Sequence, residues 1–423
     1  MTTNGSGQYR FGQPIVVTGL GVLASNGIGR TAFWEALKEG RSGIRLLDRF
    51  DASDFPCHIA GELWDFNPED FMKKSIVQNW HRHVHQSVAA SKLAVADAEL
   101  AKAGYDPERV AVGIGTSVGN PNEAYQASQE AYESRGFRKI AKLGGSAFAG
   151  HSATVHVSID LGLQGPAITI ASGCATGLDT LAWGVAQIRS GRADAALVGA
   201  TESPIFPMSF AAACSLGILS KRNDDPEKAM RPFDRNRDGI VLAEGAVALV
   251  IEREDHARAR GARILAEAMG TGSASEAGNP LILSKDGLAL SRAIESALRD
   301  AGIQPKDVDH IECHGVSLDM YDRCETRAYK HAFGDHAYRI PISAIKSMTG
   351  QAYAAGGLLG VAAAIMALNE GVVPPTINLD DPDPQCDLDY VPHRARCNDI
   401  NTALVTAISF GGTFSASVLR RVN

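Results

Sequence analysis

The chain has 423 residues, of which 45% are hydrophobic and 21% charged, and its formal net charge is -7. This composition is typical of a globular protein with a large core, divided into two or three domains, and it excludes a disordered chain. The acidic balance argues against binding to nucleic acid or to an anionic membrane surface, because both favour a basic face.

Targeting and redox signals are weak. The N-terminal stretch 1–13 is polar and rich in glycine, without the basic start and apolar stretch of a signal peptide. No apolar run approaches the ~20 residues that a membrane helix needs. The seven cysteines form no CxxC pair, so neither a disulfide framework nor a metal site is indicated. We expect a cytoplasmic protein with a free thiol, and without membrane, nucleic-acid or metal partners.

Short apolar runs alternate with amphipathic helical stretches, which is typical of an α/β protein. In chain order, the expected strands are 15–22, 110–115, 167–170, 195–198, 246–251, 310–313 and 403–409. Helices are expected over 176–189 and 286–301, the second ending at Gly302. The pattern runs twice and therefore predicts a duplicated βαβαβ core, with one half in 1–255 and the other in 256–423.

A candidate nucleophile follows the strand expected at 167–170. The sequence ASGCATG over 171–177 places Cys174 in a glycine-containing turn just before a helix. The unpaired N–H groups and the dipole at a helix N-terminus favour a thiolate, and a nearby N–H can bind an oxyanion. We therefore interpret Cys174 as a nucleophile, although a buried and inert cysteine is the commoner case for this residue type.

The second half carries three weaker signals. His314 ends an apolar strand, and ligands of open α/β sheets bind at that edge, although a strand-end histidine is more often structural. Lys346 opens the sequence KSMTGQ, and its alternative is an ordinary surface charge. The sequence SFGGT at 409–413 has two glycines that let a loop approach a ligand closely. Histidines 81, 83 and 85 are spread around an expected helix, which argues against a metal site.

In these residues the chain resembles the β-ketoacyl carrier-protein synthases, the type-II ketosynthases of fatty-acid and polyketide synthesis. The similarity spans nearly the whole chain, and its most specific stretches are VVTGLG at 16–21, RPFD at 231–234, DG at 238–239, EG at 244–245 and VPPTINL at 373–379. The resemblance implies the thiolase-like fold, an αβαβα sandwich, in a homodimer. It also implies a substrate delivered on the phosphopantetheine arm of an acyl carrier protein or carrier domain, with no other cofactor.

The resemblance also assigns roles to matching residues. Cys174 matches the acyl-accepting nucleophile, and His314 matches the first active-site histidine. Lys346 matches the lysine of a KSxxGH motif, and Glu325 matches an acidic residue that is expected to pair with this lysine. Phe410 matches a gate beside the cysteine that also supplies an oxyanion-binding N–H.

Two departures from the family pattern bear on the chemistry. Gln351 stands where KSxxGH has its histidine, and a neutral amide forms hydrogen bonds about half as strong as charge-assisted ones. Losing a group that stabilises developing charge commonly costs ~10²–10³ in rate. Val316 and Leu318 replace the two threonines that usually hold the pantetheine arm, and Tyr321 and Arg323 replace a glycine and a proline. We expect orthodox loading of Cys174 and impaired decarboxylation.

The expected function is therefore carbon–carbon bond formation without decarboxylation in bacterial secondary metabolism. An intramolecular aldol or Claisen-type cyclisation fits, with His314 as general base, as in stand-alone ketosynthase-like cyclases such as the salinosporamide bicyclase. The alternatives are an orthodox decarboxylative synthase in which Gln351 suffices, acyl transfer from Cys174 to an amine, alcohol or second carrier, and a non-catalytic partner subunit like the chain-length factors. The intact Cys174 disfavours the last of these.

Overall fold

The computed structural model describes residues 13–102, 104–119, 129–130, 132–136 and 150–422. The stretch 1–13, assessed above for a signal peptide, lies outside this range except for its last residue. Within the described residues the strands form an 11-stranded sheet, and two smaller sheets have two strands each.

The first half of the large sheet runs in the order β6 (Ala167–Ile168), β5 (Val110–Gly115), β7 (Ala195–Glu202), β8 (Gly245–Arg253) and β1 (Ile15–Ala24). The strands β6, β5 and β7 are parallel, whereas β8 runs antiparallel to both β7 and β1. The apolar runs of β5, β7, β8 and β1 are buried, as expected for strands covered on both faces, whereas both residues of β6 are exposed.

The second half repeats this order with β11 (Ile342–Ser343), β10 (His310–Glu312), β14 (Thr402–Ile408), β15 (Thr413–Arg420) and β9 (Ala266–Ser275). The parallel and antiparallel pairs also correspond strand by strand. A short contact between β1 and β9 joins the halves. The duplicated α/β core of the thiolase-like fold is thereby confirmed.

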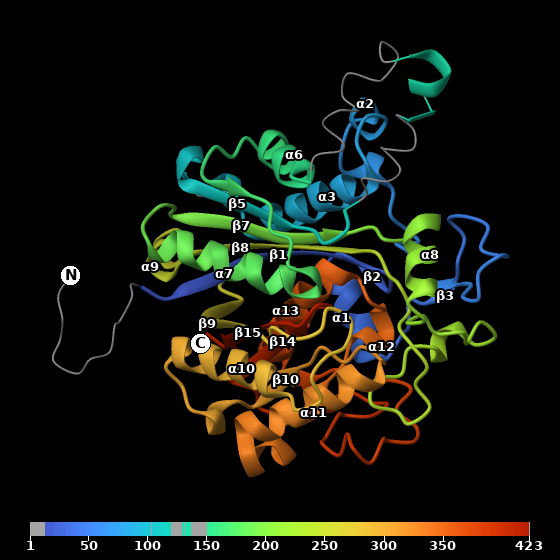
Figure 1. The fold of residues 1–423 in the computed structure, drawn as a ribbon. Coiled ribbons are helices and arrows are strands. Elements are labelled where there is room, and N and C mark those ends of the chain that lie inside the picture. The colour runs from blue at the N-terminus through green and yellow to red at the C-terminus, as the bar shows by residue number, and fades with distance from the viewer. Residues whose placement is uncertain (1–12, 103, 120–128, 131, 137–149, 423) are drawn as a thin grey trace.

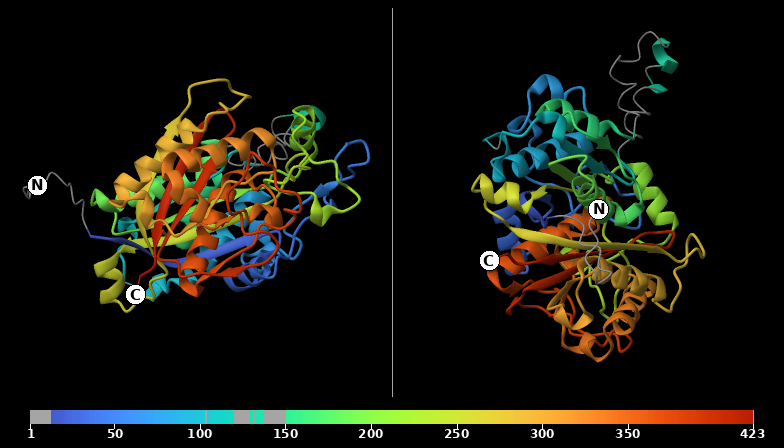
Figure 2. Two further views of the ribbon diagram at one scale, coloured as in Figure 1. Left: turned by 90° about the horizontal axis from the view of Figure 1, so that it is seen from below. Right: turned by 90° about the vertical axis from the view of Figure 1, so that its left-hand side faces the viewer.

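The helices lie in three layers (Figure 1). Two central helices, α7 (Thr176–Arg189) and α13 (Tyr353–Glu370), pack against each other between the two halves of the sheet. The outer face of the first half is covered by α3 (Arg82–Asp97) and α6 (Ser152–Leu161). The outer face of the second half is covered by α10 (Leu288–Ala301) and contacted at its edge by α11 (Asp319–Phe333), and Figure 2 shows the two halves stacked one above the other.

Helix α13 corrects one expectation from the sequence. Its 18 residues are long and apolar enough to cross a membrane by length and composition alone. However, 78% of this stretch is buried inside the protein, between the two halves of the sheet. The glycines and alanines of α13 let both sheet halves and α7 approach its backbone closely, so it is a core helix.

The remaining elements are shorter and lie around this core. They are β2 (Gly27–Ile28), α1 (Arg30–Lys38), β3 (Arg45–Leu46), β4 (Ile59–Ala60), α2 (Lys74–Val77), α8 (Pro207–Ser215), α9 (Glu254–Ala259), α12 (Lys346–Thr349), β12 (Val372–Val373) and β13 (Arg396–Cys397).

The expected strands and helices are all present, with small differences at their ends. Strand β6 stops at Ile168 rather than at residue 170, and α10 begins at Leu288 rather than 286 because Gly287 adopts a φ of 74°. Strands β2, β11, β15 and β9 of the large sheet were not predicted, and the sequence of β9, AEAMGTGSAS, has no apolar run. Its glycines lie against α10: a Cβ on Gly272 would come within 2.3 Å of the carbonyl oxygen of Ala293.

Candidate active site

Duplication of the fold brings the candidate residues together. Cys174 lies just before α7, and Gln351 lies just before α13, the corresponding helix of the second half. The two helices meet at their N-terminal ends, where a Cβ on Gly177 would lie 2.8 Å from the carbonyl oxygen of Ala354. His314 and Phe410 follow β10 and β14, at the carboxyl ends of neighbouring parallel strands. The sequence predicted this edge for His314, and the structure places it there.

Cys174 occupies a single 3-10 turn, Gly173–Ala175, that leads into α7. Gly173 has a φ of 67°, a conformation that an L side chain rarely adopts. The sulfur lies at the helix N-terminus as predicted, but the expected thiolate is wrong for the resting site. Burial raises the pKa of Cys174 to about 11, and the opposing contributions of Lys346 and of the backbone N–H groups of Phe410 and Cys174 are smaller.

The raised pKa has a measurable consequence. Only the thiolate is alkylated by iodoacetamide, so its fraction at Cys174 should rise about tenfold per pH unit below pH 11. We expect the alkylation rate of Cys174 to keep rising from pH 7 to pH 10, with the exposed Cys397 modified first at pH 7. Peptide mass spectrometry measures both sites. A plateau at Cys174 below pH 8 would contradict the raised pKa.

His314 is 2% exposed and is held through its backbone. Glu325 accepts the N–H of His314 at 2.6 Å and that of Gly315 at 2.8 Å, and Lys346 Nζ donates to the carbonyl oxygen of His314 at 2.6 Å. The expected pairing of Glu325 with Lys346 is therefore wrong. The two residues bond different backbone groups of the same turn, and the carboxylate of Glu325 also accepts hydrogen bonds from the hydroxyls of Tyr329 and Thr406.

The imidazole of His314 is uncharged. Burial, reinforced by the charge of Lys346, lowers the pKa of His314 well below its usual value of 6.5. Its Nε2 atom is buried and has no hydrogen-bond partner among the described residues. A neutral imidazole with a free ring nitrogen can bind a substrate oxygen or proton, but it is a weak base at neutral pH.

Gln351 replaces the expected histidine in direct contact with the nucleophile. Its Nε2 donates to Cys174 Sγ at 3.4 Å, and its side chain is buried. The backbone is fixed on both sides, because Gln351 N donates to Val241 O at 2.8 Å and Gln351 O accepts from Ala243 N at 3.0 Å. The amide oxygen Oε1 is buried without a partner among the described residues. The amide is thus a positioned neutral donor beside the sulfur.

Phe410 lies at the tip of the hairpin between β14 and β15 and is 41% exposed. Its backbone N–H faces the sulfur of Cys174 together with the N–H of Cys174 itself. Gly411 and Gly412 follow with φ angles of 87° and 76°, which only glycine adopts without strain. The two N–H groups are placed as in an oxyanion hole, and the partly exposed ring of Phe410 lies beside it.

The positions that usually hold the pantetheine arm offer no hydroxyl to it. Val316 is buried in the core beside the site, and Leu318 is half-buried at the start of α11. The hydroxyl oxygen of Ser317, between them, accepts the N–H of Arg231. Tyr321 lies with its ring centroid 6.1 Å from that of His314, and Arg323 forms ion pairs with Asp319 on α11 and with Asp383 between β12 and β13.

The sequence interpretation missed Glu202, at the end of β7. This fully buried carboxylate accepts the N–H groups of Ser117, Val118 and Gly119 and fixes the loop after β5. Its Oε2 also lies 3.4 Å from the N–H of Ala354, in the first turn of α13. The signal that could have identified Glu202 was its position at the end of strand β7. This strand corresponds to β14 of the second half, which leads to Phe410.

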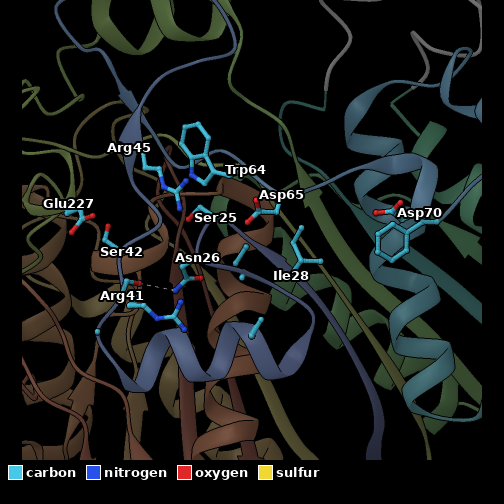
Figure 3. Close-up of a pocket in the computed structure, with 15 residues that line it drawn as sticks. Ser25, Asn26, Ile28, Arg41, Ser42, Arg45, Trp64, Asp65, Asp70 and Glu227 are labelled. Carbon is cyan, nitrogen blue, oxygen red and sulfur yellow. Dashed lines mark hydrogen bonds between the residues drawn. The ribbon is translucent and has the colours of Figure 1, made fainter.

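A separate cavity lies beside the turn that leads to Gln351. It has a volume of about 720 Å³ and is lined by Ser25, Asn26, Arg41, Arg45 and Trp64, among others (Figure 3). It borders this turn through Ser25, whose Oγ donates to the carbonyl oxygen of Thr349 at 2.9 Å. Within the described residues, no group of three or more His, Cys, Asp or Glu side chains could hold a metal ion.

Comparison with known proteins agrees with the geometry. Models of the N-terminal and C-terminal domains of the β-ketoacyl synthases match residues 12–257 and 265–380. The tetracenomycin polyketide synthase ketoacyl synthase alpha subunit of Streptomyces glaucescens is 38% identical, over 96% of this chain and 97% of that protein. The 3-oxoacyl-[acyl-carrier-protein] synthase 2 of Coxiella burnetii is also 38% identical, over 96% of this chain and 98% of that protein.

Solved structures give the same result. The structure described as a type II polyketide synthase acyl-carrier protein in complex with its ketosynthase superposes with a TM-score of 0.89 at 34% identity, over 97% of this chain and 100% of that chain. The ishigamide ketosynthase/chain length factor gives 0.90 at 31%, with the same coverage. The resemblance to stand-alone cyclases gains no support from these relatives. With Cys174 just before α7, the N–H of Phe410 facing its sulfur and His314 just after β10, the chain belongs to the β-ketoacyl synthase family, the acyltransferases that form carbon–carbon bonds.

Proposed function

We propose that this enzyme catalyses a decarboxylative condensation, in which an acyl group on Cys174 is extended by a malonyl-type unit bound to a carrier protein. This was the alternative to cyclisation in the sequence interpretation. The names of the relatives support it, and so does the state of His314, because its lowered pKa makes it a poor general base for an aldol-type cyclisation.

The first step loads the enzyme. The thiolate of Cys174 attacks the thioester carbonyl of the incoming acyl group, and the N–H groups of Cys174 and Phe410 hold the resulting oxyanion. The resting thiol of Cys174 gives up its proton to solvent before this attack. The pantetheine group then leaves as a thiolate that takes a proton from solvent, and the acyl group remains on the cysteine. This step uses neither His314 nor Gln351 as an acid or base.

The second step forms the new bond. The malonyl carboxylate leaves as CO₂, and the enolate that develops on the thioester oxygen requires hydrogen-bond donors. Two side chains serve as donors in this scheme: His314, whose Nε2 is buried without a partner among the described residues, and Gln351, whose Nε2 contacts the sulfur of Cys174. The enolate carbon attacks the acyl carbonyl, and Cys174 departs as a thiolate. Two neutral donors suffice in this scheme because both are buried, where hydrogen bonds are stronger than in water.

The observation that carries the proposal is the contact between the Gln351 amide and Cys174 Sγ, which puts a donor where the motif has a histidine. The test supplies an acyl carrier and a malonyl carrier and measures released CO₂ together with chain extension. We expect CO₂ release that requires both substrates. Acyl loading without any CO₂ release would contradict the proposal and favour non-decarboxylative cyclisation. The reason to consider such a cyclisation is that Gln351 stands where the motif has a histidine.

We further propose that the enzyme works with a carrier protein and as a two-chain assembly, with a second copy docked at β6. This strand lies at one end of the sheet in the described chain. Ile168 on β6 is 39% exposed and Ile159 on the adjacent α6 is 67% exposed, an apolar surface beside an unpaired strand edge. Light scattering of the purified chain should give twice the mass of one chain. The mass of a single chain would contradict the docking of a second copy and would mean that any two-chain assembly includes a different protein.

A further inference from the structure

Ser409 is a buried serine whose hydroxyl joins the two parts of the oxyanion hole. It lies between β14 and Phe410 and has no exposed surface. Its Oγ donates to the carbonyl oxygen of Ser172 at 2.5 Å and accepts the N–H of Ala175 at 2.7 Å. These two partners flank Cys174 in the chain. One hydroxyl therefore bridges the nucleophile turn and the hairpin that carries Phe410.

The nucleophile turn is built to receive this hydroxyl. A Cβ on Gly173 would lie 3.0 Å from Ser409 Oγ and 3.1 Å from its Cβ, so the close approach favours glycine at 173. On the other side of the turn, Ser117 Oγ donates to the carbonyl oxygen of Gly173 at 2.6 Å. The turn is thus held between two serines from different strand ends.

The hairpin side is equally constrained. Ser409 N donates to Thr413 O at 2.8 Å, and Gly412 N donates to Ser409 O at 3.1 Å, which closes the turn around Phe410. Because both the N–H and the carbonyl of Ser409 are used, the hydroxyl fixes the whole hairpin tip relative to Cys174. The hydroxyl is therefore a direct side-chain link between the hairpin that carries the Phe410 N–H and the turn that carries the Cys174 N–H.

We propose that Ser409 is a positioning residue that sets the two oxyanion-binding N–H groups for acyl loading. It does not touch the substrate and does not take part in proton transfer. The inference rests on Cys174 being the acyl acceptor, as proposed above. Loss of one donor from an oxyanion hole costs on the order of 10²–10³ in rate, so displacement of the Phe410 N–H should cost roughly 10–100-fold.

The test compares two reactions of the same thiol in the purified full chain. Loading from an acyl carrier develops an oxyanion, whereas alkylation by iodoacetamide does not. In Ser409→Ala we expect the maximal rate of loading to fall roughly 10–100-fold, with the half-saturating carrier concentration close to that of wild type. The rate of Cys174 alkylation should fall far less than loading, because the Phe410 N–H is one of the smaller contributions to the pKa of Cys174. Intact-mass measurements over time follow both reactions.

Ser220→Ala is the matched control. Ser220 is also fully buried, and its hydroxyl donates to Asp238 and accepts the N–H of Arg222, so both variants remove a bridging hydroxyl. It should lose stability but load normally. Ser409→Cys keeps nearly the volume of serine with a weaker hydrogen-bonding group, and it should fold and load at an intermediate rate, with the adduct located by peptide mass.

The outcomes separate this inference from the function on which it rests. If wild type does not load at Cys174, the proposed function fails. If wild type loads and Ser409→Ala or Ser409→Cys loads equally fast, the positioning role is wrong. If loading and alkylation fall in parallel, Ser409 supports the thiol generally, and the inference is again overturned.

Discussion

Cys174→Ala is expected to abolish formation of the acyl-enzyme and to lower the rate of chain extension by on the order of 10⁴-fold or more. The thiol is the one nucleophile that both oxyanion-binding N–H groups face, so no neighbouring group can take over the covalent step. Intact-mass spectrometry after incubation with an acyl carrier detects the adduct, and product analysis measures extension.

Cys397→Ala is the control for this experiment. Cys397 is an exposed free cysteine on β13, remote from the site in the fold, and its removal should leave the acyl adduct and the rate unchanged. An adduct of undiminished amount in Cys174→Ala would show that another thiol carries the acyl group. That result would also remove the basis for the proposed roles of Phe410 and Ser409.

Replacing Gln351 separates loading from decarboxylation. In Gln351→Ala we expect CO₂ release and extension to fall by ~10²–10³, because the enolate loses one of two donors, while loading of Cys174 stays within about threefold. Gln351→His restores the usual motif. If its imidazole is protonated during the reaction, the bond becomes charge-assisted and about twice as strong, and CO₂ release should rise.

The exposed Gln385 offers a control for loss of a glutamine side chain outside the site, and Gln385→Ala should leave CO₂ release unchanged. Equal CO₂ release by wild type and Gln351→Ala would show that His314 alone stabilises the enolate. A loss of loading in Gln351→Ala that matches the loss of CO₂ release would mean that the amide acts on Cys174 itself, through its 3.4 Å contact with the sulfur.

The lowered pKa of His314 favours one of the two chemistries that the sequence left open. A general base works best with a pKa near the operating pH, and burial moves His314 away from that range. A hydrogen-bond donor to an enolate needs only a proton on the ring nitrogen that faces the substrate. The same burial that weakens His314 as a base strengthens its hydrogen bond, which favours decarboxylative condensation.

The sequence by itself determined the fold class, most of the strands of the large sheet and the position of Cys174. These features rest on local signals: apolar runs of strand length, a glycine turn before a helix, and residues adjacent in the chain. Strand β9 was not predicted because its small residues give no apolar run. They are required by the close approach of α10, which is a contact between separate segments and leaves no local sequence pattern. The same holds for α13, whose apolar sequence suits a membrane as well as a protein core.

Only the tertiary structure decided how the site works. The partners of Glu325 and Lys346, the uncharged state of His314 and the protonated thiol of Cys174 all follow from burial and from contacts between residues far apart in the chain. Ser409 shows this most plainly, because its partners Ser172 and Ala175 lie more than 230 positions away. Electrostatics and hydrogen bonding depend on what surrounds a group in space, and the duplicated fold sets those surroundings when it brings the N-terminal ends of α7 and α13 together.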